Sequence, residues 1–180
     1  QNKSKDGFEG RYSLRVVRAD GTDERVLLDF SEADYYGPHA WSPDGKWIAV
    51  QERRGGSPQR IVLVSPDNGG VRTLFTHPDG QGRLQRFKFS PDGRWLAFHE
   101  QTNLGRNVYT LPVAEAATPT EIATQAEMVG WTPDGNGILL TRGRDTTSEL
   151  FLQAVSNGKA VSAPSIVQAV PEFQGWPLAV

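Results

Sequence analysis

Short apolar runs next to tight turns recur along this chain. The turn Ser42-Pro43-Asp44-Gly45 precedes the run Trp47-Ile48-Ala49-Val50, and the turn Ser90-Pro91-Asp92-Gly93 precedes Trp95-Leu96-Ala97-Phe98. A third copy, Thr132-Pro133-Asp134-Gly135, is followed by apolar residues 137–140. Continuous apolar runs of this length predict strands that are buried on both faces. The pattern therefore predicts an all-β fold built from repeats.

The turn sequence has a specific chemistry. Proline presets φ for the second position of a type I turn, and glycine accepts a positive φ at the exit. The side chains of Ser42 and Asp44 can hydrogen-bond the local backbone. Each copy therefore predicts a tight hairpin between two strands.

Each repeat divides into four strands. The aromatic residues before the turns, Trp41, Phe89 and Trp131, are spaced at a propeller-like interval of about 40–50 residues. The expected strands are 39–41, 46–52, 59–64 and 71–75; then 86–89, 94–100, 107–112 and 121–124; then 129–131, 137–141, 149–155 and 165–169. Four short strands per repeat of this length predict the blades of a β-propeller.

The two ends of the chain predict incomplete blades. Residues 13–17 and 24–28 are expected to form the last two strands of one blade, and residues 174–176 the first strand of another. The prediction is a flexible segment at 1–10 and about four blades within 11–180. Three arrangements stay open: a piece of a larger propeller, a closed four-bladed ring, or partial rings that pair through open edges as homo-oligomers.

Charge and composition exclude several classes of function. The chain has 19 basic and 21 acidic residues and a net charge of −2, whereas nucleic-acid binders usually have a basic excess. No apolar run approaches the 18 residues of a membrane span, which argues against membrane insertion. The chain has no cysteine, which excludes disulfides, thiol catalysis and cysteine-based metal sites.

Residues 11 to about 176 resemble the TolB-type, WD-repeat-like propellers of bacteria. The likeness rests on the three turn copies and on following strands such as Arg60-Ile61-Val62-Leu63-Val64. A looser likeness links residues 150–159 to the last blades of periplasmic or membrane-tethered sensor propellers. The resemblance implies a periplasmic or secreted protein whose commonest role is binding other proteins, and it transfers no catalytic residue. Propellers of this family usually have six or more blades.

Arginine and tyrosine gather on the loops expected at one face of the blades. These two residue types are enriched at binding hot spots, so this face is predicted to bind another protein or an acidic peptide segment. Ordinary solvated loops would show the same composition, and that interpretation stays open. The candidate residues are Tyr35, Tyr36, Arg53, Arg54, Arg83, Arg106, Arg142 and Arg144.

The innermost strands carry a second candidate set. His39, Arg86 and Lys88 are predicted to line a central channel. The aspartates of the turns belong to separate blades and each has a local backbone partner, so they are predicted to stabilise the turns rather than to bind calcium. Recurring tryptophans, such as Trp41 with Trp131 and Trp47 with Trp95, predict packing between blades.

The sequence predicts neither a cofactor nor a metal site. The three histidines, His39, His77 and His99, occupy unrelated blade positions, which suggests no catalytic triad. There is also no Gly-x-Ser-x-Gly elbow. Three alternatives to a binding module stay open: a propeller polysaccharide lyase that uses His39, the gating domain of a prolyl-oligopeptidase-type peptidase, and a self-assembling subunit.

Overall fold

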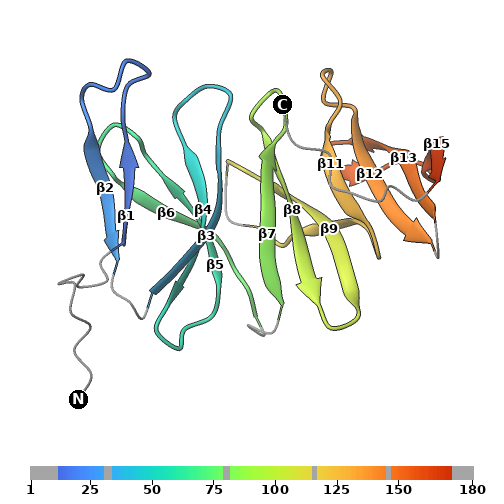
Figure 1. The fold of residues 1–180 in the computed structure, drawn as a ribbon, viewed down its shortest axis with the longest axis horizontal. Coiled ribbons are helices and arrows are strands. Elements are labelled where there is room, and N and C mark those ends of the chain that lie inside the picture. Colours follow the sequence, from blue (N-terminus) through green and yellow to red (C-terminus); the bar gives the residue numbers. More distant parts are fainter. Residues whose placement is uncertain (1–11, 31–33, 79–81, 115–116, 145–146, 172–180) are drawn as a thin grey trace. The chain divides into compact units, whose positions relative to one another are not determined.

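A computed structural model describes residues 12–30, 34–78, 82–114, 117–144 and 147–171 (Figure 1). These residues form antiparallel β-strands joined by turns. Within them, no helix is long and apolar enough to cross a membrane. The chain divides into two compact units, Gln1–Gly80 and Gln81–Val180, and each is described by itself.

Unit 1 contains a two-stranded and a four-stranded sheet. The strands are β1 (Tyr12–Val16) and β2 (Arg25–Phe30), and then β3 (Asp34–Trp41), β4 (Ile48–Arg54), β5 (Arg60–Val64) and β6 (Val71–Thr76) in sequential order. One core lies between the two sheets. It consists of Ile48, Val50, Val62 and Val64, packed against Leu14, Val16, Leu27 and Leu28.

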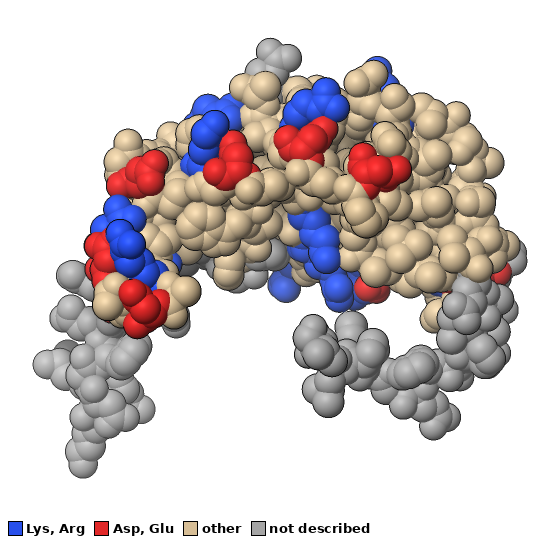
Figure 2. Space-filling model, turned by 90° about the horizontal axis from the view of Figure 1, so that it is seen from above, with Lys and Arg blue, Asp and Glu red and all other residues tan. Residues whose placement is uncertain are grey.

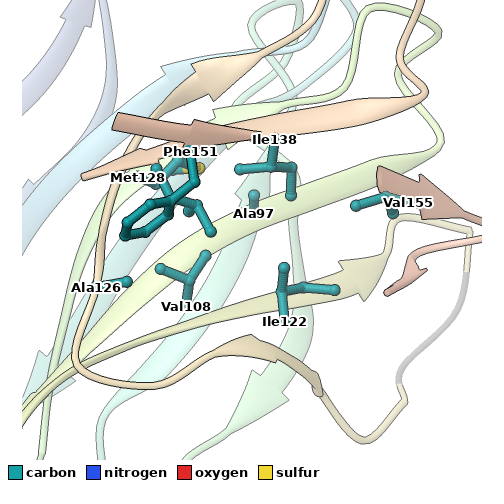
Figure 3. Packing of buried hydrophobic residues seen from close by; sticks show 9 residues of the cluster. Ala97, Val108, Ile122, Ala126, Met128, Ile138, Phe151 and Val155 are labelled. Carbon is teal, nitrogen blue, oxygen red and sulfur yellow. The ribbon is translucent and has the colours of Figure 1, made fainter. Parts of the chain in front are cut away.

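Unit 2 contains two sheets with a shared core. The strands of the first are β7 (Arg83–Phe89), β8 (Trp95–Thr102), β9 (Gly105–Pro112) and β10 (Thr120–Ala123). Those of the second are β11 (Glu127–Trp131), β12 (Gly137–Arg144), β13 (Thr147–Ser156), β14 (Lys159–Ala160) and β15 (Ser165–Pro171). Figure 3 shows Met128, Ile138 and Phe151 of the second sheet facing Ala97, Val108 and Ile122 of the first.

The second strands of the first two full repeats are buried as the apolar runs predicted, whereas in the third repeat Leu139 is only half-buried. Residues 48–52 of β4 and residues 96–99 of β8 are buried without interruption, so neither face of these strands is open to solvent. The predicted all-β fold of consecutive antiparallel blades is confirmed.

The three turn copies make the same hydrogen bonds. The hydroxyl of Ser42 donates to Asp44 Oδ1 over 2.6 Å and accepts the Trp47 amide over 3.0 Å. The pairs Ser90 with Asp92 and Thr132 with Asp134 repeat the first contact at 2.6 Å. The exit glycines have φ values of 71°, 70° and 72°. The same network of side-chain hydrogen bonds thus closes the three hairpins β3–β4, β7–β8 and β11–β12.

The turn aspartates are ionised and locally paired. Burial alone raises the pKa of Asp92, but hydrogen bonds from the Ser90 hydroxyl and from Arg94 outweigh it and lower the pKa to about 2. Arg94 Nε lies 2.6 Å from Asp92 Oδ2, and Lys46 Nζ lies 3.5 Å from Asp44 Oδ2. Red and blue atoms accordingly lie side by side in several places in Figure 2.

Hydrogen bonds join the two sheets of unit 2. The Trp131 indole donates to the carbonyl of Lys88 over 3.1 Å, and the Met128 amide donates to His99 Nε2. The Thr110 hydroxyl donates to the carbonyl of Gly158. A Cβ on Gly158 would lie 2.3 Å from ring atoms of Trp95, so this glycine packs directly on the indole.

Trp41 does not pack as its repeat position predicted. It is 52% exposed, whereas Trp131, at the same position in its blade, bonds to a first strand of the neighbouring sheet. The sheet that packs beside β3–β6 consists of β1 and β2 in the described part. It therefore offers no first strand whose carbonyl could accept the Trp41 indole.

The first strands are longer than the sequence suggested, because each contains a β-bulge. In β3 the register shifts between Tyr36 and His39, and in β7 between Gln85 and Lys88. Pairing resumes beyond the shift, so β3 begins at Asp34 rather than at residue 39. The predicted segment 1–10 and the predicted strand 174–176 lie outside the described residues.

The positive φ of the turn glycine can be tested in unit 1. Gly45 has a φ of 71°, and Gly56 lies outside that region, but a Cβ would meet open space at both positions. We expect Gly45→Ala to lower the free energy of unfolding by about 1–2 kcal/mol, because an L-residue is strained there. Gly56→Ala serves as the matched control in urea denaturation, and equal losses for both variants would contradict the role of the turn.

Candidate functional site

The eight residues predicted on loops lie instead at the ends of strands. The bulges of β3 and β7 explain this correction for Tyr35, Tyr36 and Arg83, because pairing resumes beyond them. The strands with the other five residues extend two or three residues further than the sequence predicted. The structure places Tyr35 and Tyr36 in β3, Arg53 and Arg54 in β4, Arg83 in β7, Arg106 in β9, and Arg142 and Arg144 in β12. The side chains of Tyr35, Tyr36 and Arg144 are outside the described part, and only their backbone pairing is used below.

In unit 1, a buried carboxylate binds two of the arginines. Glu52 is 1% exposed, and its Oε1 accepts from Arg54 Nε over 2.7 Å. Its Oε2 accepts from Arg60 Nη2. A buried carboxylate needs such charged partners, because burial without them is costly. Arg54 is therefore an internal partner. Neither Glu52 nor Arg60 was predicted as a site residue, because nothing in the local sequence pattern marks the two as a pair.

Arg53 differs from its neighbour Arg54. Side chains alternate along a strand, and Arg53 is exposed while Glu52 is buried. No ion pair or hydrogen bond of the Arg53 side chain occurs among the described residues. In the β3–β4 ladder Arg53 lies opposite Tyr35, and Glu52 lies opposite Tyr36.

In unit 2, one glutamate lies between two arginines. Arg106 Nη1 pairs with Glu127 Oε1, and Arg106 Nε also donates to the side chain of Gln101. Arg86 Nη2 lies 3.7 Å from Glu127 Oε2, which is an ion pair without a hydrogen bond. The sequence analysis missed Glu127, since nothing in the local pattern relates it to either arginine.

The last two arginines with described side chains have opposite surroundings. Arg142 donates to the carbonyls of Thr124 over 3.1 Å and of Gln125 over 3.3 Å, and its guanidinium lies 5.1 Å from the ring centroid of Phe151. Arg83 is exposed at the start of β7, with no ion pair in the described part of the chain. Arg142 therefore joins elements of the fold, whereas Arg83 faces solvent.

The three residues predicted to line a channel all lie exposed on first strands. His39 is in β3, and Arg86 and Lys88 are in β7. Lys88 reaches toward β11, because its Nζ lies 3.8 Å from where a Cβ of Gly130 would be. That His39 shares a channel with the other two stays a prediction, since it belongs to a different unit.

His99 is fully buried and is kept neutral. Burial lowers its pKa, and the charges of Arg86 and Arg106 lower it further, to about 4. Because Nε2 accepts the Met128 amide, the proton of the neutral ring is on Nδ1. Within the described chain, Nδ1 is a buried side-chain atom without a hydrogen-bond partner. The imidazole is therefore a link between two sheets.

The described residues contain no group of three or more His, Asp or Glu side chains placed to hold a metal ion. His77, in unit 1, is buried and makes an edge contact with the ring of Phe75 at 6.2 Å. His39 is exposed on β3, and His99 is buried in unit 2. The histidines thus occupy three different kinds of environment.

Comparison with known proteins identifies the architecture. No family model matches the sequence, and no curated protein matches it either. The structure resembles TolB from Acinetobacter baumannii, with a TM-score of 0.65 and 22% identity over 91% of this chain and 38% of that one. It also resembles a putative TolB from Agrobacterium tumefaciens, with a TM-score of 0.63 and 19% identity over 87% of this chain and 53% of that one.

The chain has the fold of TolB-type β-propellers. It spans 38% and 53% of the length of these two TolB chains, as a partial propeller would. An oligogalacturonate lyase in complex with manganese is also similar, with a TM-score of 0.64 and 18% identity over 79% of this chain and 41% of that one. At these identities the comparisons show the fold alone.

The neutral state of His99 predicts a pH dependence. Its pKa falls from an ordinary 6.5 to about 4 in the folded chain, so the unfolded chain takes up a proton first as the pH drops. The free energy of unfolding should therefore fall between pH 6.5 and about pH 4. The turn residue Asp92 acts in a separate window, between its ordinary pKa of 3.8 and about 2.

His99→Gln isolates the contribution of the imidazole. Glutamine keeps an acceptor for the Met128 amide, does not titrate, and is the residue at the corresponding position of β4, Gln51. Thermal unfolding of both proteins at pH 7, 5.5 and 4.5 should show a smaller loss of Tm in the variant. If the Tm of the wild type and of the variant fell equally as the pH is lowered, His99 would not be the source of the pH dependence.

Proposed function

We propose that this chain is a non-catalytic, protein-binding segment of an extracytoplasmic TolB-type propeller. The partner is bound by exposed arginines, and by tyrosines, at the ends of the first and second strands. The extracytoplasmic location and the protein partner follow from the resemblance to TolB-type propellers and stay part of the proposal.

One observation supports the proposal above the others. Arg53 and Arg83 are exposed, and neither has an ion pair or a hydrogen bond within the described residues. A guanidinium that is free of internal partners can form bidentate bonds to carboxylates of another molecule. Tyr35, paired with Arg53 across β3 and β4, and the nearby Tyr36 supply the aromatic residue type that accompanies arginine at hot spots.

The internal contacts narrow the predicted surface. Arg54, Arg106 and Arg142 each bind groups of their own unit, so removing them would weaken the fold as well as any interface. The proposal therefore centres on two candidate positions, one in each unit: Arg53 with Tyr35 and Tyr36 in unit 1, and Arg83 in unit 2. Arg144 stays in the predicted set through its position at the end of β12.

The similar lyase and peptidase folds give the alternative of an enzyme. A prolyl endopeptidase matches with a TM-score of 0.62 and 12% identity over 92% of this chain and 28% of that one. The manganese complex of the lyase makes metal content the informative measurement. One manganese or zinc ion per purified chain would favour a lyase-like enzyme, and light scattering would detect the alternative of a self-assembling subunit.

Charge reversal tests the proposed surface. We expect Arg53→Glu and Arg83→Glu each to weaken the binding of the native partner at least about tenfold, because each replaces a hot-spot cation by a repelling charge. The partner is first captured from an extracytoplasmic extract and identified by mass spectrometry, and its affinity is then measured by calorimetry. Lys159→Glu, on β14 of unit 2, is the control, because Lys159 is exposed and has no ion pair among the described residues.

The proposal is wrong if the partner binds the wild type, Arg53→Glu and Arg83→Glu with equal affinity. Circular dichroism and Tm measurements on each variant show whether a loss of binding comes from a loss of structure. Arg54→Glu should instead lower the Tm, because it leaves Glu52 buried beside a second acid.

A further inference from the structure

In unit 2, Arg86 and Arg106 both pair with the carboxylate of Glu127, but their contacts differ in strength. Arg106 has two partners, because it pairs with Glu127 and also donates to Gln101. Within the described residues, the one contact of the Arg86 side chain is its ion pair to Glu127 at 3.7 Å, which is too long for a hydrogen bond. The side chains of Arg86 and Glu127 are 45% and 34% exposed, so solvent and ligands reach this pair.

The local charge does not balance. In the described part of unit 2, Arg86 and Arg106 bring two positive charges to the single carboxylate of Glu127, in a chain whose net charge is −2. Lys88 lies two residues beyond Arg86 on β7, and its Nζ lies near Gly130 of β11. Arg86 and Lys88 thus lie on β7, whereas Arg106 reaches Glu127 of β11 from β9.

Backbone strain is present at Arg86. Its φ is 52°, in the left-handed region, and the bulge of β7 opens directly after Gln85. The other described non-glycine residues with positive φ, Asp23, Gln125 and Asn157, lie in turns or bends rather than in a strand. A bulge re-aims a side chain, and strain of this kind is concentrated at functional sites.

We propose that Arg86, together with Lys88, binds a carboxylate from an acidic segment of a partner protein, and that Glu127 is an internal competitor that occupies the site in the free chain. The proposal deepens the proposed function and rests on its premise that the chain binds proteins. The incoming carboxylate displaces Glu127 from Arg86 only, while Arg106 keeps its pair with Glu127.

The proposal predicts that removing the carboxylate of Glu127 strengthens ligand binding. If Glu127 were purely structural, its removal would loosen Arg106 and weaken any ligand binding nearby. If it is a competitor, Glu127→Gln removes both the competing carboxylate and a charge that repels the ligand, so affinity for a carboxylate rises. Glutamine is isosteric and still offers an oxygen to Arg106.

The test uses two acetylated, amidated peptides, one with four glutamates and one with glutamines in their place. Isothermal titration of the full chain at low salt should show binding of the glutamate peptide only. We expect Glu127→Gln to tighten this binding about three- to tenfold and Arg86→Gln to weaken it about tenfold, in line with one charge-assisted contact. Arg86→Asn should weaken it similarly, while asparagine tolerates the left-handed φ and protects the fold. Arg94→Gln should bind like the wild type.

Three results would overturn the inference. The first is no difference between the two peptides in the wild type. The second is unchanged or weaker binding by a Glu127→Gln variant that keeps the wild-type Tm. The third is equal weakening by Arg86→Asn and Arg94→Gln, which would indicate general charge attraction. The two proposals can fail separately. If the wild type does not bind the glutamate peptide but Arg53→Glu no longer binds the native partner, the site at Arg86 is refuted and the proposed function is supported.

Discussion

A hydroxyl that donates to a carboxylate and accepts a backbone amide is the interaction on which the other features depend. In the first copy, Ser42 makes both bonds, to Asp44 and from Trp47, and closes the hairpin between β3 and β4. The closed hairpin sets the register of the two strands. That register places apolar side chains such as Ile48 and Val50 in the core and brings the charged residues together at the other end of the strands.

Charged residues at those strand ends divide into structural and free groups. Glu52 and Glu127 each bind two arginines, one pair from inside a buried environment and the other from a partly exposed one. The difference matters because a buried carboxylate cannot release its cations without a large desolvation cost, whereas an exposed one can exchange them. Several of the predicted arginines are therefore unavailable to a partner, because they are already paired within their own unit. The proposed binding depends on the arginines without such partners in the described residues.

The fold itself is a poor guide to activity. TolB proteins, an oligogalacturonate lyase and a prolyl endopeptidase all contain sheets arranged like these, at 12–22% identity to this chain. A fold shared at these identities distinguishes none of these functions. The proposed binding therefore rests on local features of this chain: the exposed Arg53 and Arg83, and the loosely paired, strained Arg86.

The sequence alone determined the strands, their order and the hairpins, because these depend on contacts between residues close together in the chain, as in the turn from Ser42 to Trp47. It did not reveal the bulges in β3 and β7. A first strand has a similar apolar pattern with and without a bulge, so the bulge is visible only once the strand is paired with its partner. The pairing of Glu127 with Arg86, and of His99 with the Met128 amide, was decided by tertiary structure. Residues of neighbouring sheets meet there, and no local pattern relates a carboxylate or an imidazole to a partner so far away along the chain.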